Sequence, residues 1–477
     1  MAPADATLVR PGRVLATVTA AQVLSVASAS VVAVALPALS RELEADGAEQ
    51  QWVVDSFVLV FASLLVAGGV VGDRRGRRDA LLCGLALFAA GSLWCALAPD
   101  VGWLLAGRVV QALGPPLVLP ASLAIVGATF RDPAARARAI GFWGAGSGAG
   151  LALGPLLGGL LVDGLGWRWV FGANVAICAL LVPLALRQVP RDRPAAPAHR
   201  FDAFAAALIT AGVALLVFAL IEGRRLGWTS PAVLGALVAA AVLGATFVAR
   251  ERRHPAPLVD LGLLRHRPFL AANLGGATVY GALTGLAVYL SVFLQQVQGR
   301  SALEAGLCLL PQGLTTAACA PLAGRMTAAV GPRPPILAGM ALIAAAVLAL
   351  VRLEPDTPVS QFWWLFALLG TGTGLALPAM TVTALSAAPA RRAGMASALH
   401  NASRQLGQTF AVAILGTVIL ARAGAAADSG RIAPGGVADW MAGLHLALLL
   451  SAGGVLAAAA AIAVLIPRAP APRPAGG

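Results

Sequence analysis

The sequence predicts an all-α polytopic membrane protein, and three observations support this fold class. Hydrophobic residues make up 59% of the 477 residues and charged residues only 12%, whereas soluble proteins average roughly 25% charged residues. Arginine-rich segments alternate with apolar segments along the chain. Several long runs carry no charged residue at all: 14–40, 139–162, 268–299, 357–390 and 440–467. Each run is near or above the ~20 residues that a helix needs to cross a bilayer core.

We expect fourteen membrane-spanning helices. The first resembles a signal peptide, because Arg10 and Arg13 precede an apolar run that contains Ala27-Ser28-Ala29, but this run continues to Leu39. It is therefore too long for a signal peptide and is interpreted as an uncleaved span. The expected spans are 14–37, 53–72, 80–98, 102–128, 139–162, 167–186, 203–221, 230–249, 269–295, 303–323, 335–352, 361–387, 394–420 and 441–466.

The arginines fall on one side of this topology. The net charge of +13 raises the alternative of a nucleic-acid-binding protein. However, the intervening loops contain less arginine; RELEADGAEQ carries four acidic residues, and EGRRLGW is the main exception. The positive-inside rule then places both termini in the cytoplasm of a bacterial cell and leaves nucleic acid without support. The arginine-rich segments are the N-terminal tail, 73–78, 131–138, 187–200, 250–267, 325–333, 391–392 and the tail after 467.

Two similar halves are visible. Leu119-Pro120-Ala121 recurs as Leu377-Pro378-Ala379, in both cases after a glycine-rich segment. The segment GRMTAAVGPRPP (324–335) takes the place in the second half that GDRRGRRD (72–79) takes in the first. Parallel repeats of six spans are typical of transporters whose substrate site lies between the halves. We expect an N-terminal six-helix bundle, a linker with two inserted spans, and a C-terminal six-helix bundle, which correspond to 1–187, 188–268 and 269–477.

The segment GVVGDRRGRR, 69–78, is a candidate conformational switch. Gly76 permits a backbone turn that a Cβ would hinder. Asp73, at the end of its helix, would face the positive N-terminal end of the span that starts near Gly394. The alternative is a solvated loop that only fixes the topology. The switch residues are Gly69, Asp73, Arg74, Gly76, Arg77 and Arg78.

This segment resembles the GxLxDRxGRR signature of the major facilitator superfamily. The chain further resembles the fourteen-span drug:proton antiporters of that superfamily along nearly its whole length. The matching segments are ALPAL (35–39), WRWVFGANVAI (167–177), FLQQVQGRSALEAGLCLLPQG (293–313) and HNASRQLGQ (400–408). The resemblance implies a major facilitator fold, two six-helix bundles plus two inserted helices, that exposes a shared cavity to each side of the membrane in turn.

Glycines recur every fourth residue in the span 139–162, so they share one helix face and let another helix approach closely. The segment GLALGPLLGG resembles the GxxxGPxxGG signature of drug antiporters, which implies a gate, and Pro155 should kink the helix. Ordinary tight packing is the alternative. The gate residues are Gly146, Gly150, Gly154, Pro155, Gly158 and Gly159.

Proton coupling has three candidates. Arg108, in RVVQALG, resembles an arginine that takes part in coupling in relatives; the alternative is that it extends to the membrane surface. Relatives carry an intramembrane Asp in the first span, where this chain has Ser28. Coupling therefore cannot simply be inherited, and Asp55 and Glu222 are the substitute carboxylates. For these two, helix capping and simple solvation are the respective alternatives.

Polar and aromatic side chains within the spans could line the substrate path, although such residues serve packing more often than binding. The cavity candidates are Ser28, Gln111, Trp143, Asn273, Gln296 and Gln312. A cytoplasmic gate is expected at Asn401, Arg404 and Gln405.

We expect a monomeric secondary active exporter of lipophilic or amphiphilic drugs or antibiotics, driven by proton antiport. The alternative is a dedicated metabolite or self-resistance exporter, or a facilitator, with altered or absent coupling. The sequence contains no GxxxxGK[ST] motif for ATP. It also shows no catalytic constellation, and its five cysteines form no CxxC pair. We therefore expect no enzyme activity, no cofactor and no metal site.

Overall fold

The structure is a computed structural model that describes residues 10–45, 47–191, 202–254, 261–300, 302–388, 393–423, 432 and 434–467. Within these residues the chain is helical and contains no strand, which confirms the all-α class. The α-helices are α1 (Pro11–Glu42), α2 (Gly47–Arg75), α3 (Arg77–Ala96), α4 (Val101–Ala112), α5 (Pro115–Thr129), α6 (Pro133–Leu165), α7 (Arg168–Gln188), α8 (Ala203–Leu226), α9 (Pro231–Arg253), α10 (Arg267–Val292), α11 (Ala302–Val330), α12 (Arg333–Leu350), α13 (Val359–Ser386), α14 (Ala393–Ala423) and α15 (Val437–Leu465).

One expected span is interrupted. The segment 102–128 was expected as a single helix, but it forms α4 and α5 with a break at Leu113 and Gly114. The cause is local, because Pro115 and Pro116 have no backbone N–H to continue the hydrogen-bond ladder. The described residues contain ten helical segments that are long and apolar enough to cross a membrane, and α4 and α5 together count as one of them. The chain is therefore a multi-pass membrane protein, and the total of fourteen spans stays a prediction.

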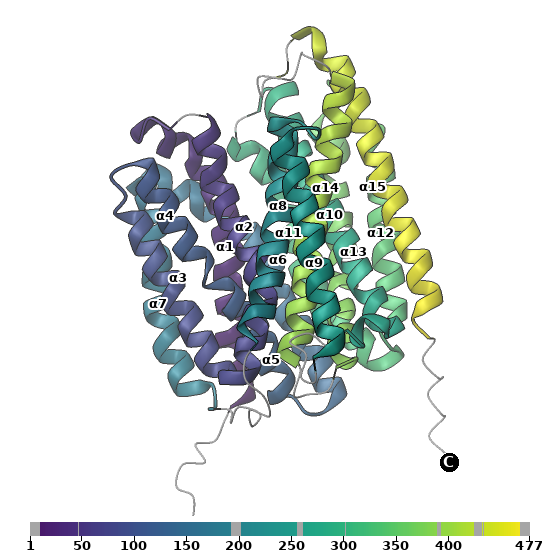
Figure 1. The fold of residues 1–477 in the computed structure, drawn as a ribbon. Helices are drawn as coiled ribbons and strands as arrows, with labels where there is room; N and C mark the ends of the chain where they lie inside the picture. The colour runs from purple at the N-terminus through teal and green to yellow at the C-terminus, as the bar shows by residue number, and fades with distance from the viewer. Residues whose placement is uncertain are drawn as a thin grey trace, which may run out of the picture.

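The helices gather into two groups, which Figure 1 shows with α3, α4 and α7 on one side and α10, α12 and α15 on the other. Two hydrophobic clusters consist mainly of buried side chains of α1 to α7, and a third, larger one consists mainly of side chains of α10 to α15 with contributions from α2, α8 and α9. The start of α1 and the end of α15 lie at the same end of the molecule, the lower one in Figure 1. We call this end, which also holds the α2–α3 turn, the arginine-rich end.

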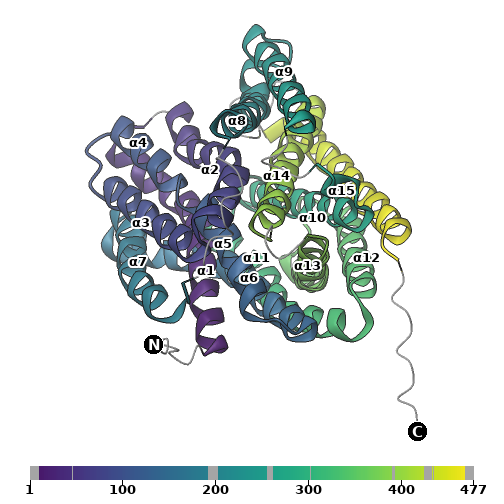
Figure 2. The ribbon, with the colours of Figure 1, turned by 60° about the horizontal axis from the view of Figure 1, so that its bottom comes forward.

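Helices α6 and α11 make the most extensive contact between the two groups, and Figure 2 shows them at the centre. A Cβ added at Gly141 of α6 would lie 2.6 Å from the Ala320 carbonyl oxygen of α11. One added at Gly148 would lie 2.7 Å from the Ala317 nitrogen, and one at Gly324 would lie 2.5 Å from the Ala137 oxygen. Only glycine allows these two backbones to approach so closely. We call this contact the α6–α11 glycine interface.

Helix α8 packs against α2 and α14, and α9 covers α8 from outside (Figure 2). Asp202 joins the inserted pair at the arginine-rich end. Its carboxylate accepts a hydrogen bond from the Ala205 N–H at 2.9 Å and forms an ion pair with Arg250 at 2.9 Å. Burial raises the pKa of Asp202, but these two partners outweigh that effect and hold the pKa below its ordinary value.

The turn between α2 and α3 depends on Gly76, whose φ of 108° is a conformation that side chains disfavour. The two arginines that follow are directed into the first helix group. Arg78 donates to the Leu186 carbonyl oxygen at 2.6 Å, near the end of α7, and Arg77 reaches the Ala124 oxygen of α5 at 3.4 Å. The turn therefore joins α3 to two neighbouring helices.

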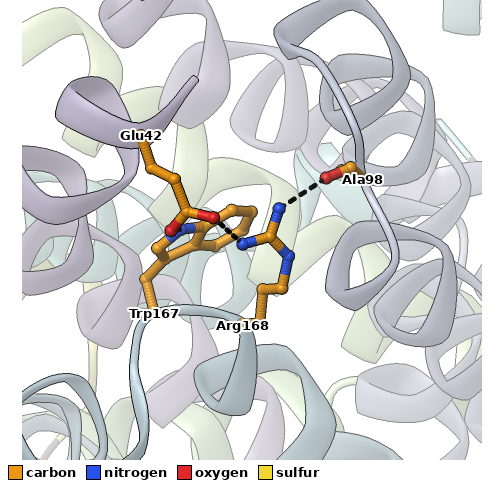
Figure 3. A network of polar contacts seen from close by, with 4 residues as sticks. All are labelled: Glu42, Ala98, Trp167 and Arg168. Atoms are coloured by element: carbon orange, nitrogen blue, oxygen red, sulfur yellow. Dashed lines mark hydrogen bonds and ion pairs between the residues drawn. The ribbon is translucent and has the colours of Figure 1, made fainter. Parts of the chain in front are cut away.

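A network of polar contacts joins α1, the turn after α3, and α7 at the opposite end (Figure 3). Glu42, beyond the expected first span, pairs with Arg168, which also donates to the Ala98 oxygen at 3.0 Å. The second Glu42 oxygen accepts a hydrogen bond from Trp167 Nε1 at 2.7 Å. The Arg168 and Trp167 hydrogen bonds hold the pKa of Glu42 below its usual value.

Replacing Gly76 by Ala should lower the thermal unfolding midpoint of the protein in detergent, because a side chain at this φ costs about 1–3 kcal/mol. Gly127→Ala is the matched control, since an added Cβ there meets nothing within 4 Å and the site is helical. This control should leave the midpoint unchanged or raise it. Equal losses for both variants would contradict the assigned role of the turn.

Glu42→Gln should lower the unfolding midpoint slightly at pH 7, by no more than about 1 kcal/mol, because the ion pair is partly exposed. Gln can still accept the Trp167 hydrogen bond but cannot form the ion pair. Since the folded-state pKa is lowered, the contribution is complete above the unfolded-state pKa and is lost as pH falls through the folded-state pKa. Thermal unfolding at pH 7 and pH 3 checks this, and a difference as large at pH 3 as at pH 7 would contradict it.

Candidate functional site

A small central cavity lies between the two helix groups. Its volume is about 20 Å³, enough for about one water molecule, whereas drug-sized ligands occupy pockets of roughly 300–1,000 Å³. Helix α6 lines it from the first group and α11, α13 and α14 from the second. The lining residues are Ile140, Trp143, Gly144, Thr316, Ala320, Thr373, Gly374, Leu377, Pro378, Thr381 and Arg404. A drug-sized ligand can enter only if the groups move apart.

A second cavity of about 420 Å³ opens at the arginine-rich end of the same helices. It is lined by residues 133–137 of α6, Thr327 of α11 and Thr383 of α13, with His266 at its side. Each of these three helices therefore runs from this cavity to the central one. The contact of Gly324 with Ala137 and Arg138 lies between the two sets of lining residues, because Ile140 and Ala320 line the central cavity and Ala137 and Thr327 line the second one. The α6–α11 glycine interface thus separates the central cavity from the arginine-rich end.

Arg404 was expected to form a gate at the cytoplasmic end of its helix. It instead lies farther along α14, at the central cavity. It is 11 positions beyond the first residue of α14, about 16 Å along the helix at ~1.5 Å per residue. Its guanidinium carbon lies 4.1 Å from the centre of the Tyr280 ring of α10. A Cβ at Gly276 would lie 3.3 Å from Arg404 Cγ, so this glycine leaves room for the side chain.

Arg108 is 1% exposed and does not extend to the membrane surface. Its Nε donates to the Val53 oxygen of α2 at 2.9 Å and its Nη1 donates to Gln111 Oε1 at 2.6 Å. Gln111 Nε2 in turn donates to Ser92 Oγ of α3 at 2.8 Å. The guanidinium also lies 4.4 Å from the centre of the Phe57 ring. Neutral groups of α2, α3 and α4 therefore hold this buried cation within the first group.

Ser28 is 2% exposed, and its Oγ accepts a hydrogen bond from Asn174 Nδ2 of α7 at 3.0 Å. Ser28 stands where the family that this sequence resembles has a carboxylate, and here it forms an uncharged pair with Asn174. Ser28 is not among the residues that line the central cavity. The sequence reasoning missed Asn174, although an amide within an apolar helix is a visible signal.

The other coupling and switch candidates are only partly described. Glu222 is 2% exposed, so the alternative of a solvated carboxylate is wrong, and it does not line the central cavity. The side chains of Asp55 and Asp73 lie outside the described part of the structure. Helix α14, the proposed partner of Asp73, does pack against α2. The residue expected at its start, Gly394, also has no described surroundings.

The glycines expected to form a gate face a helix of their own group. A Cβ at Gly146 would lie 2.9 Å from Gln22 Oε1, and one at Gly150 would lie 2.9 Å from Val26 Cβ, both on α1. Further along, Gly154 and Gly158 are buried, while a Cβ at Gly159 would meet nothing. The side chain of Pro155 is outside the described part, and α6 is a single helix through it.

Of the six cavity candidates, Trp143 alone lines the described central cavity. Its Nε1 donates to Ser122 Oγ at 3.2 Å. Asn273 donates to the Phe269 oxygen of its own helix, and Gln296 is exposed and accepts from the Ile432 N–H. Gln312 is half-buried outside the lining. The two remaining gate residues are Asn401, which donates to the Ser397 oxygen, and half-buried Gln405.

The sequence reasoning missed most of the lining. It singled out neither the threonines Thr316, Thr373 and Thr381 nor the glycines Gly141 and Gly148. A signal existed in α6, where Gly141, Gly144 and Gly148 form a second glycine series on another face. The threonines gave no signal, because hydroxyls are common within membrane helices. Among the described residues, no three potential metal ligands lie together.

Comparison with known proteins agrees with this arrangement. The model of the family "Major Facilitator Superfamily" matches residues 18–412. The multidrug resistance protein Stp of Mycobacterium tuberculosis is 39% identical over 393 residues, 82% of this chain and 73% of the relative. The puromycin resistance protein of Streptomyces alboniger is 35% identical over 95% of this chain and 90% of its own length. The methyl viologen resistance protein of Salmonella typhimurium is 33% identical over 82% of this chain and 79% of its own.

Two solved structures share the fold. The human organic anion transporter MFSD10 superposes with a TM-score of 0.69 at 17% identity, covering 95% of this chain and 99% of its own. The proton:xylose symporter XylE superposes with a TM-score of 0.61 at 15% identity, covering 93% and 94%. The family match covers more than half of the chain and several relatives exceed 30% identity, so this chain belongs to the major facilitator superfamily.

Proposed function

We propose that the protein is a secondary active exporter of lipophilic or amphiphilic drugs or antibiotics in the bacterial plasma membrane. The observation that carries the proposal is the central cavity, which both groups line and which is too small for a drug-sized ligand in this state. Binding then requires the groups to separate, as alternating access demands. The relatives named for multidrug, puromycin and methyl viologen resistance support the export of drugs or antibiotics. The superfamily is one of transporters, so the proposal contains no enzymatic step.

The proposed membrane topology is the one that the sequence predicts. The protein has two six-helix bundles, within 1–187 and 269–477, and two inserted helices, with fourteen spans in total, and it works as a monomer. Both termini and the arginine-rich end face the cytoplasm. The 420 Å³ cavity is then a cytoplasmic vestibule. The structure belongs to a state in which the α6–α11 glycine interface closes the path from this vestibule to the central cavity.

The proposed energy source is the proton gradient. The protein would then exchange drug for protons, as a drug:proton antiporter. Asp55 is the first candidate for the coupling carboxylate. It lies on α2, whose Val53 oxygen accepts a hydrogen bond from Arg108. Glu222, buried on α8, is the second candidate. A carboxylate within a membrane-spanning helix can take up and release a proton, which is what proton exchange requires.

A second function is favoured by one observation. Ser28 and Asn174 form a neutral hydrogen-bonded pair where the resembling family has a carboxylate. An exporter of one metabolite, or a facilitator without proton coupling, would need no titratable group there.

Asp55→Asn should abolish drug accumulation driven by an imposed pH gradient in everted membrane vesicles, because the amide cannot exchange protons. The amount of protein in the membrane should stay unchanged. Asp79→Asn is the matched control, since Asp79 is exposed at the start of α3 and should leave accumulation intact. Unchanged accumulation in Asp55→Asn would remove Asp55 from the mechanism. If the wild-type vesicles take up drug equally fast with and without the gradient, the uncoupled alternative holds.

A further inference from the structure

The central cavity contains a single charged side chain among its described lining residues, and that side chain is a cation. Arg404 is 8% exposed and no carboxylate accompanies it in the lining. Glu222, the buried carboxylate on α8, lies outside the lining. The electrostatic character of the described cavity is therefore set by one guanidinium group.

No described residue accepts a hydrogen bond from this guanidinium. Its Nε is buried without a hydrogen-bond partner, and its guanidinium carbon lies over the face of the Tyr280 ring, 4.1 Å from the ring centre. Arg108 gives the internal comparison, because neutral acceptors at 2.9 Å and 2.6 Å satisfy it. A buried cation without an acceptor is unfavourable. Arg404 is therefore set up to receive an acceptor from outside the protein.

The other polar groups of the lining cannot act as competing donors. The hydroxyl of Thr316 donates to the Gln312 oxygen at 2.7 Å, that of Thr373 to the Leu369 oxygen at 2.7 Å, and that of Thr381 to the Leu377 oxygen at 2.9 Å. The indole N–H of Trp143 is used by Ser122. Arg404 is thus the available donor among these groups, and the remaining lining is apolar.

We propose that the central cavity selects amphiphilic organic anions: molecules with an apolar or aromatic body and an acidic group that pairs with Arg404. This rests on the proposed export function and specifies its substrate class. The acidic group supplies the acceptors that the guanidinium lacks, in a charge-assisted hydrogen bond. The apolar body lies against Ile140, Trp143 and Leu377. A cation of the same shape would meet a like charge with no carboxylate in the described lining to offset it.

Two dyes test the proposal because they share a xanthene ring system and differ in charge. Fluorescein is an anion at neutral pH and rhodamine 123 is a cation. Fluorescence anisotropy with the purified full chain should show fluorescein binding about tenfold more tightly than rhodamine 123. Arg404→Gln should weaken fluorescein binding about tenfold and remove the preference, since it deletes the charge-assisted pairing. Arg404→Lys, which keeps the charge, should retain the preference for fluorescein.

Arg422→Gln is the matched control, since it removes the same charge from an exposed position of the same helix. It should leave both affinities unchanged. Equal or tighter binding of rhodamine 123 by the wild type overturns the proposal, and so does unchanged fluorescein affinity in Arg404→Gln. Vesicle transport separates this from the exporter proposal. Accumulation of rhodamine 123 without fluorescein contradicts only the anion preference, whereas accumulation of neither dye contradicts export itself.

Discussion

The structure depends on the direct contact between the backbones of α6 and α11. Without side chains at Gly141 and Gly324, the two helices meet at a separation that any Cβ would prevent. This contact brings the two bundles together over the central cavity and reduces it to about 20 Å³. It also separates that cavity from the larger one at the arginine-rich end. The close approaches at these glycines are van der Waals contacts, so separating the two helices there breaks no hydrogen bond of the glycines themselves.

The buried charges divide between the two bundles in a way that suits a moving interface. Arg108 is satisfied by groups of α2 and by Gln111 within the N-terminal bundle, so movement of that bundle as a rigid body leaves its bonds intact. Arg404 belongs to the other bundle and faces the space between them. Arg108, which is hydrogen-bonded within its bundle, therefore stabilises that bundle. Arg404, whose Nε has no hydrogen-bond partner, is available to a ligand.

Much of the fold followed from the sequence, because helix length and charge alternation are local properties. The position of Gly76 in a turn followed from the same kind of signal, and its φ is positive. The functional assignments depended on which face of a helix meets which partner, and here the sequence was insufficient. The glycine series with Gly146 packs on α1, whereas Gly141 and Gly148 form the interface between bundles. The position of Arg404 along α14 was predictable, because α14 begins at Ala393, one residue before its expected span; that its side chain lines the central cavity was not.

The distance between the arginine-rich ends of α6 and α11 tests this account most directly. Spin labels at Arg131→Cys and Val330→Cys, in a background without the five native cysteines, occupy exposed positions just before α6 and at the last residue of α11. Double electron–electron resonance in lipid should give a short distance without substrate and a second, longer population when substrate or a pH gradient is added. A single unchanged distance under all these conditions, in protein that still transports, would contradict the claim that this interface opens.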